Sequence, residues 1–91
     1  MIRLNVFIQV SDENRSALIE IAEDLAAASL DDLGCVAYDL FESTTRYGVL
    51  MICETWTEEA ALDAHINTTH FKTLVPKIQE LGEMKIEQFV F

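Results

Sequence analysis

Apolar and polar positions alternate along residues 2–10, which predicts a β-strand with two distinct faces. The even positions from Ile2 to Val10 are all aliphatic, whereas the odd positions carry Arg3, Asn5, Phe7 and Gln9. A period of two over nine residues is typical of a strand. Residues 35–42 and 49–56 are two further strands, and the short turn-rich segment 43–48 joins them into an antiparallel hairpin. Residues 84–91 form a last strand.

Apolar residues at helical spacing fill the intervals between these strands. Ser11 or Asp12 caps a first helix whose apolar stripe runs to Leu33, and Gly34 fits the position just past its end. Thr57 caps a second helix that runs to about Asn67. Thr68 or Thr69 starts a third that runs to about Leu81, and Gly82 ends it. Pro76 should bend or interrupt this third helix. The expected stripe of the first helix comprises Leu18, Ile21, Ala22, Leu25, Ala28, Ser29 and Leu33.

The order strand, helix, strand, strand, helix, strand is the split βαβ arrangement. Right-handed crossovers then place both helical layers on one face of a four-stranded antiparallel sheet. The fold class is therefore α+β, ferredoxin-like βαββαβ. Ninety-one residues suffice for a single domain, residues 1–91.

Both faces of the predicted sheet are apolar. When Tyr38 pairs with Glu54 in the hairpin, one face carries Val36, Tyr38, Leu40, Leu50, Ile52, Glu54 and Trp56. The other face carries Phe7, Ala37, Phe41, Val49, Met51 and Cys53, with Phe89 and Phe91 nearby. A solvated face of an antiparallel sheet should be polar, and a large apolar patch marks an interface. We therefore expect a homodimer that closes over the open sheet face.

The net charge of −10 argues against partners that are themselves strongly anionic. Binding to nucleic acid or to an anionic membrane needs a basic surface, so we expect neither. The acidic pairs, including Asp31–Asp32, are predicted to lie on solvated helix faces and ends. No apolar run reaches the ~18 residues of a membrane span, and residues 1–10 do not resemble a signal peptide. The expected location is the cytoplasm.

The two cysteines, Cys35 and Cys53, should not form a disulfide. In the predicted hairpin Cys53 lies opposite Asp39, which leaves the two sulfur atoms about 13 Å apart at ~3.3 Å per strand residue. Both are expected to be reduced thiols that pack rather than react.

Several unlike polar side chains should converge on one apolar space between helices and sheet. His65 interrupts the apolar stripe of the second helix, and Tyr38, Glu54 and Trp56 share the sheet face below it. His70 lies in the first turn of the third helix. Convergent polar groups in an apolar setting are the pattern of a small-molecule site. Each also has a packing interpretation. His65 would form a hydrogen bond with Glu54, and both Trp56 and Tyr38 would be core residues. His70 would be a surface residue.

The sequence offers no signal for a bound metal or cofactor. Two histidines five residues apart with one carboxylate match no recognised zinc or iron spacing, and there is no CxxC or HxxxH. There is no glycine-rich phosphate loop or dinucleotide fingerprint. We therefore expect neither a metal nor a cofactor.

Two stretches resemble the antibiotic biosynthesis monooxygenase domain family. They are Glu54-Thr55-Trp56 followed by residues 60–72 (AALDAHINTTHFK), and residues 34–40 (GCVAYDL). Length and element order agree along essentially the whole chain. The resemblance implies a dimeric α/β barrel with a pocket in each protomer. Family members similar to this chain, a quinol-monooxygenase-like branch, oxidise quinols or polycyclic phenols with O₂ and no bound cofactor.

On this resemblance, His65 or His70 is the base or holds the substrate anion. Tyr38 and Glu54 orient the substrate or an imidazole, Trp56 stacks on its ring, and Phe71 and Asn5 join the substrate-binding candidates. Haem degradation is disfavoured, because the relatives' ligating histidine falls near Val75. Another branch with a similar histidine segment isomerises an anionic phosphorylated compound. Three functions stay open: a monooxygenase, a non-redox isomerase and a ligand-binding module.

Overall fold

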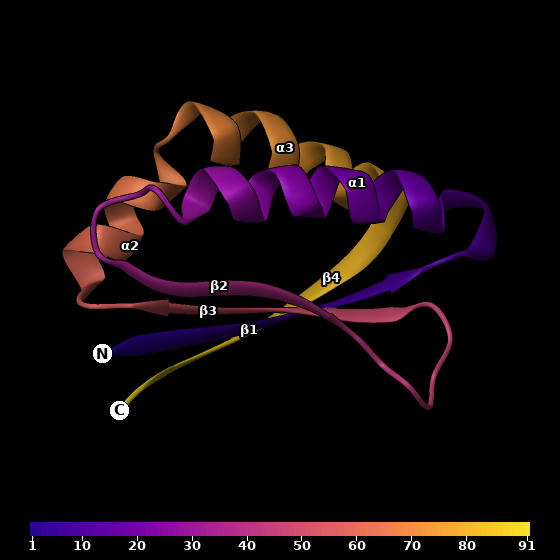
Figure 1. Ribbon diagram of the computed structural model, residues 1–91, viewed down its shortest axis with the longest axis horizontal. Helices are drawn as coiled ribbons and strands as arrows, with labels where there is room; N and C mark the ends of the chain where they lie inside the picture. The colour runs from indigo at the N-terminus through magenta and orange to yellow at the C-terminus, as the bar shows by residue number, and fades with distance from the viewer.

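A computed structural model describes residues 1–91 and shows seven elements in the expected order (Figure 1). The strands are β1 (Ile2–Val10), β2 (Cys35–Glu42), β3 (Val49–Trp56) and β4 (Gly82–Val90). The helices are α1 (Asp12–Ser29), α2 (Glu59–Ile66) and α3 (Thr69–Leu81). The side chain of Ser11 caps α1 by accepting from the N–H of Asn14, and Thr68 caps α3 by accepting from the N–H of Phe71.

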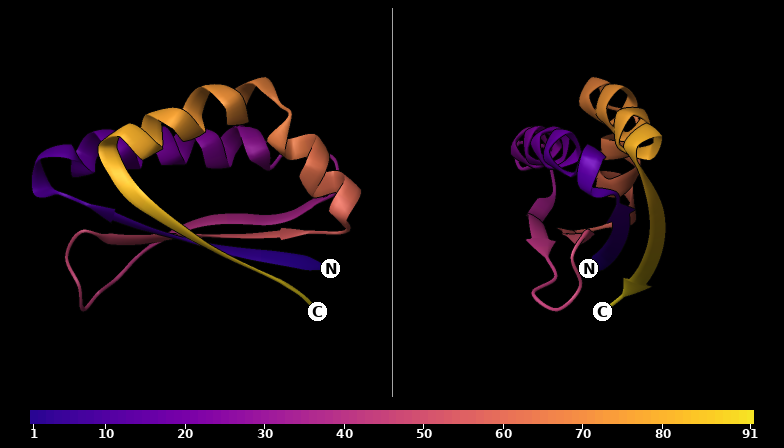
Figure 2. Two further views of the ribbon diagram at one scale, coloured as in Figure 1. Left: turned by 180° about the vertical axis from the view of Figure 1, so that it is seen from behind. Right: turned by 90° about the vertical axis from the view of Figure 1, so that its right-hand side faces the viewer.

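The four strands form one antiparallel sheet in the order β2-β3-β1-β4. All three helices lie on one side of it, and the other side has no helical cover (Figures 1 and 2). The predicted hairpin register is confirmed from Ala37 onward: Tyr38 pairs with Glu54, and Cys53 lies opposite Asp39. The ferredoxin-like βαββαβ fold is therefore confirmed, and both cysteines are free.

A β-bulge at the start of β2 corrects the predicted faces of that strand. Cys35 pairs with Trp56, but Ala37 pairs with Thr55, so the register shifts by one residue between them. An extra residue in one strand reverses the direction of the side chains before it. Cys35 consequently packs against the core, and Val36, which the uniform register placed on the inner face, is exposed.

The helix boundaries also differ from the expected ones. The first helix ends at Ser29, so Leu33 is 92% exposed in the following loop instead of extending the apolar stripe. Glu58, and not Thr57, occupies the N-cap of α2. Pro76 does not interrupt α3, because Val75 and Ile78 on either side of it are buried and hold the helix on the sheet across the lost hydrogen bond.

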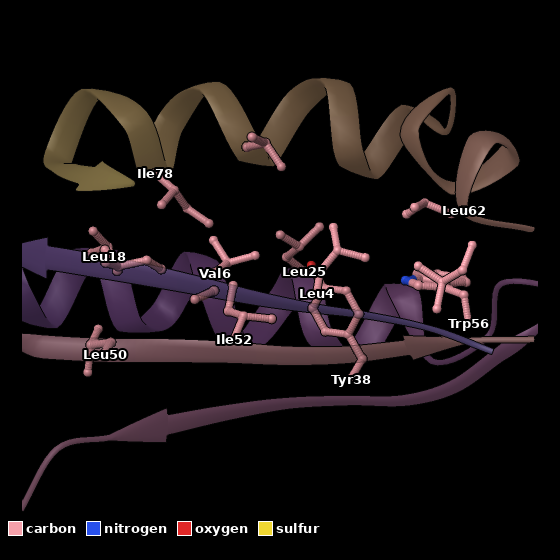
Figure 3. Packing of buried hydrophobic residues seen from close by; sticks show 14 of the residues in the cluster. Leu4, Val6, Leu18, Leu25, Tyr38, Leu50, Ile52, Trp56, Leu62 and Ile78 are labelled. Atoms are coloured by element: carbon pink, nitrogen blue, oxygen red, sulfur yellow. The ribbon is translucent and has the colours of Figure 1, made fainter. Parts of the chain in front are cut away.

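The core lies between the inner sheet face and the helices (Figure 3). The even positions of β1 from Ile2 to Val10 are all buried, as their alternation predicts. They pack with residues of α1 and β3, among them Leu18, Leu25 and Ile52. Each such side chain contributes about 1.5–3 kcal/mol when it leaves water. Trp56 is fully buried at the end of β3, below α2.

The outer face of the sheet keeps apolar side chains without cover from this chain. Phe41, Phe89 and Phe91 are exposed, and Phe7 and Met51 are half-buried. Phe7 and Met51 are direct cross-strand partners, and Met51 also pairs with Phe41, so these three residues form one apolar strip across β1, β3 and β2.

No helix of the fold combines the length and the apolar composition needed to cross a bilayer.

Gly34 adopts a backbone conformation that other residues resist, with φ of +82°. It lies in the loop before β2, several residues beyond the end of α1, and not at the helix cap that the sequence suggested. A Cβ at this position would overlap the Cβ of Ala61 and lie 2.8 Å from the Oγ1 of Thr57. Close approach of the loop to α2 therefore depends on the missing side chain.

We expect Gly34→Ala to destabilise the fold by about 3 kcal/mol. Positive φ costs an alanine ~1–2 kcal/mol, and overpacking against α2 adds a similar amount. Urea unfolding followed by circular dichroism measures the change. Gly34→Asn is the matched comparison, because asparagine tolerates positive φ but keeps the overlap. Its free energy of unfolding should lie between those of the parent and of Gly34→Ala. A Gly34→Ala protein within 0.5 kcal/mol of the parent, a range typical of ~neutral surface substitutions, would contradict this account.

Candidate functional site

A cavity of about 480 Å³ lies between the inner sheet face and the helices. Its size lies within the range of small-molecule sites, roughly 300–1,000 Å³. Twelve of its 18 lining residues are hydrophobic, and they include Leu4, Leu62, Phe71 and Ile86. The cavity extends to β4, whose inner residue Ile86 is 57% exposed because no helix covers that part of the strand. The polar lining residues are Tyr38, Glu54, His65, Lys72, Gln79 and Gln88.

Tyr38 and Glu54 project from paired positions of β2 and β3 into this cavity. The Nε1–H of Trp56 donates a hydrogen bond of 3.0 Å to the Oε1 of Glu54. Burial raises the pKa of the Glu54 carboxyl, and the bonds from Trp56 and Tyr38 only partly oppose this. Burial and the neighbouring Glu54 likewise raise the pKa of the Tyr38 phenol, so it is protonated at neutral pH. The sheet thus presents a phenol beside a carboxyl group of weakened acidity.

His65 projects from α2 into a cluster of aromatic rings. Its ring centroid lies 4.5 Å from that of Trp56, 5.6 Å from Tyr38 and 5.2 Å from Phe71. The side chain is 1% exposed. Burial lowers the pKa of His65, and the carboxylate of Asp32 partly opposes this shift. The neutral imidazole is favoured in this apolar setting.

Asp32, in the loop between α1 and β2, joins the two histidines. Its Oδ2 lies 2.8 Å from Nδ1 of His65 and 2.8 Å from Nε2 of His70. A carboxylate oxygen only accepts hydrogen bonds, so each of these ring nitrogens carries the hydrogen. This fixes His65 as the Nδ1–H tautomer and leaves its Nε2 as an acceptor. That Nε2 is buried and has no hydrogen-bond partner.

The predicted site residues occupy three different places. Tyr38, Glu54, His65 and Phe71 line the cavity. Trp56 and His70 do not line it: Trp56 lies beneath His65 and bonds Glu54, and His70 is half-buried on the far side of Asp32. Asn5 lies on the outer sheet face, paired with Cys53 and Glu87, because the odd positions of β1 all face away from the helices. In this chain Asn5 therefore has no path to the cavity.

Sequence reasoning missed Asp32 and assigned the bond of His65 to the wrong carboxylate. Glu54 bonds Trp56 instead, and His65 bonds Asp32. The sequence pattern predicts a solvated helix end for both Asp31 and Asp32, but α1 stops at Ser29 and the loop turns back toward α2. The N–H of Thr57 donates to the carbonyl of Gly34, which ties this loop to the start of α2. Only the topology indicates that Asp32 could reach the histidines, because it puts loop 30–34 and the α2–α3 junction at one end of the sheet.

The thiol of Cys35 is not a candidate nucleophile. It is half-buried, and burial together with the negative charges of Asp32 and Glu54 raises its pKa to about 11. The thiolate is the reactive form, so this cysteine is inert at neutral pH. This agrees with the expectation of a reduced thiol that packs.

We expect Glu54→Gln to stabilise the protein at pH 8, by on the order of 1 kcal/mol. The folded-state pKa of Glu54 is raised, so its contribution to stability is complete below the unfolded pKa and is lost as the pH rises through the folded pKa. Glutamine keeps an acceptor for Trp56 and does not titrate. Urea unfolding from pH 4 to pH 8 should show the advantage of the variant shrink toward acid pH. Glu59→Gln, at an exposed position, should show no such trend, and an equal trend in both would refute the assignment.

Comparisons with known proteins agree with this architecture. A family model described as antibiotic biosynthesis monooxygenase matches residues 1–77. The protein "Putative monooxygenase YcnE" of Bacillus subtilis is 36% identical over 81 residues, which are 89% of this chain and 85% of that protein.

Two crystal structures share the fold over nearly the full length. A Bacteroides thetaiotaomicron protein of unknown function, described as a possible oxidoreductase, is 56% identical with a TM-score of 0.97, covering 99% of this chain and 96% of its own. A structure named antibiotic biosynthesis monooxygenase is 26% identical with a TM-score of 0.92, covering 100% of this chain and 98% of its own. The chain belongs to the antibiotic biosynthesis monooxygenase family.

Proposed function

We propose that the protein is a cofactor-independent monooxygenase that oxidises a quinol-like or phenolic small molecule with O₂. One observation carries the proposal: His65 borders an apolar cavity, Asp32 fixes the hydrogen on its Nδ1, and its Nε2 is a buried acceptor without a partner. An oriented, neutral imidazole with a free lone pair is the form that a general base requires.

The proposed reaction begins when Nε2 of His65 takes the phenolic proton. The resulting phenolate is electron-rich enough to reduce O₂ by itself, so the protein needs only a base, a dry cavity and donors for the anion. For a phenol that becomes a para-quinone, O₂ accepts four electrons. One oxygen atom forms the new carbonyl, and the other leaves as water with the two hydrogens that the ring and the hydroxyl lose.

The lining residues suggest how a phenol would sit. The imidazole of His65 has three aromatic neighbours, and of these Phe71 is half-buried, lines the cavity and meets His65 edge-on. We infer that the phenyl ring of Phe71 moves aside as the substrate enters. On the sheet, the phenol of Tyr38 is a donor whose ring centroid lies 5.6 Å from that of His65, and Glu54 is its partner on β3. Trp56 supports the imidazole from below and does not stack on the substrate, since it does not line the cavity.

Oxygen uptake with a panel of hydroquinones and naphthols tests the proposal. We expect O₂ consumption by the parent protein and at least a 100-fold loss in His65→Gln, within the ~10²–10⁴ that a general base contributes. His70→Gln should retain more activity, because His70 does not line the cavity. Thermal unfolding must show that both variants fold. Oxygen uptake that does not depend on His65, or no oxygen uptake with any member of the panel, would refute the proposal.

A non-redox isomerase is the second candidate, and the presence of Glu54 and His65 in one cavity favours it. Both groups line one cavity, and burial raises the pKa of the Glu54 carboxyl and lowers the pKa of the His65 imidazole, which favours the uncharged form of each. Such an acid and base can move a proton between two carbons of a carbonyl compound. Turnover under strictly anaerobic conditions distinguishes this function from the first. Tight binding of a phenol without any turnover would instead support a ligand-binding module.

We also propose that two copies of the chain pair through the open sheet face. The apolar strip of Phe7, Phe41 and Met51 has no cover within the chain, and Phe89, opposite Arg3 on β4, and Phe91, just after β4, are exposed as well. A second copy would bring the same strip in a symmetric, self-complementary contact. The cavity lies on the opposite side of the sheet and would stay accessible in such a dimer.

A further inference from the structure

Three potential metal ligands meet at the end of the fold where α1, α2 and α3 approach one another. They come from the loop after α1, from the last turn of α2 and from the first turn of α3. The ligand atoms, Oδ2 of Asp32, Nδ1 of His65 and Nε2 of His70, lie within 4.8 Å of one another. Both nitrogens point at one carboxylate oxygen at 2.8 Å. The spacing of the two histidines in the sequence does not indicate this group of ligands, because the third ligand, Asp32, lies 33 residues before His65.

We propose that Asp32, His65 and His70 bind one divalent first-row cation, such as Zn²⁺ or Co²⁺. Two imidazoles and one carboxylate form a donor set that these ions prefer. Metal–ligand bonds of ~2.0–2.2 Å place neighbouring ligand atoms about 3.0–3.4 Å apart. The two 2.8 Å separations need to widen by a few tenths of an ångström. The two ring nitrogens, which lie within 4.8 Å of each other, need to come to the same spacing. The His70 and Asp32 side chains are both partly exposed and have room to rotate into this geometry.

The exchange of two hydrogen bonds for a cation costs no ionisation at the ligands. Each imidazole already carries its hydrogen on the nitrogen that faces Asp32. When the cation binds there, the hydrogen moves to the other ring nitrogen. The carboxylate supplies one negative charge, and the chain as a whole carries −10, so the surrounding field also favours a cation.

The cation would not contact a substrate in the cavity. His65 lines the cavity, but Asp32 and His70 do not, so the metal lies behind the imidazole, on its solvent side. Water reaches Asp32 and His70, which are 15% and 24% exposed, and can complete the coordination shell. The site therefore differs from a catalytic metal centre, which keeps an open position toward the substrate.

Metal binding would instead switch the role of His65, and this consequence rests on the proposed function. With the cation on Nδ1, the hydrogen sits on Nε2, and the imidazole faces the cavity as a donor instead of an acceptor. A general base that has lost its lone pair cannot take the phenolic proton. The same three residues thus give an active, metal-free state and an inactive, metal-bound state.

The test is titration of the tag-free, chelator-treated protein with Co²⁺, followed by the visible absorption of the bound ion. We expect one Co²⁺ per chain and at least tenfold weaker binding in Asp32→Asn and in His70→Ala. Asp31→Asn is the matched control, because it removes an equal charge from the adjacent exposed position and should bind like the parent. Circular dichroism confirms that each variant folds; His70 is half-buried at a helix start, so its removal should be tolerated.

Two results would overturn the site. One is the absence of a one-to-one Co²⁺ complex at millimolar metal, and the other is equal binding by the parent and both ligand variants. Oxygen uptake gives a separate readout: Zn²⁺ should inhibit the parent at the concentration at which it binds, and EDTA should restore activity. Co²⁺ binding without any oxygen uptake would uphold the site and refute the proposed function. Full activity of the metal-saturated protein would refute the switch.

Discussion

Asp32→Asn is expected to lower the turnover number for phenol oxidation by a factor on the order of 10²–10³. Asp32 does not line the cavity, so it touches no substrate and acts through His65 as a positioning residue. The carboxylate oxygen only accepts hydrogen bonds, and it thereby holds the His65 hydrogen on Nδ1. An asparagine can turn its amide N–H toward the ring. The imidazole then accepts at Nδ1 and carries its hydrogen on Nε2, the wrong tautomer for a base.

The kinetic signature separates positioning from a general structural defect. We expect kcat to fall and KM to stay within about twofold, since the substrate contacts are unchanged. Nitrogen-15 NMR of labelled histidine should show the His65 hydrogen move from Nδ1 to Nε2 in the variant. Asp31→Asn should leave both the rate and the spectrum unchanged. Assays run with EDTA exclude an effect through bound metal. A normal kcat in a folded Asp32→Asn protein would remove Asp32 from the mechanism.

The fold followed from local patterns because its main signals are local. The two-residue period of β1 and the short hairpin segment specify strands and their neighbours without any distant contact. The errors came where tertiary contacts override the pattern. Val36 has the apolar character of an inner-face residue, but the bulge at the start of β2 turns Cys35 inward in its place. Leu33 fits a helical stripe, but α1 ends before it, and the loop exposes it.

The candidate site was predictable where residues share a face and unpredictable where loops bring them together. Tyr38 and Glu54 follow from the hairpin register, and His65 follows from its position on a buried helix stripe. Asp32 lies in a loop, and nothing in its neighbourhood distinguishes it from Asp31. Its role depends on the three-dimensional path of residues 30–34, which the bond from Thr57 N–H to Gly34 fixes. Long-range side-chain bonds such as those of Asp32 leave no periodic signal in the sequence.

Met51→Glu is expected to convert the protein to a monomer at micromolar concentrations. Met51 lies on the middle row of the apolar strip, between Phe7 on β1 and Phe41 on β2. Symmetry would bury two glutamates in one interface, and each unpaired carboxylate costs several kcal/mol. Every ~1.4 kcal/mol weakens association tenfold, so the dissociation constant should rise by at least 10³. The side chain is half-buried on the outer face, away from the core, and the protomer should still fold.

Sedimentation velocity over a concentration series measures the effect. Thr73→Glu introduces the same charge at an exposed position of α3, on the other side of the sheet, and should remain dimeric. A parent protein that sediments as a monomer at every concentration, or a Met51→Glu protein that still dimerises, would rule out pairing through this face. The cavity faces the helices, so a folded Met51→Glu monomer should keep its ability to bind a phenol. Loss of binding in that monomer would mean that the partner shapes the cavity from across the sheet.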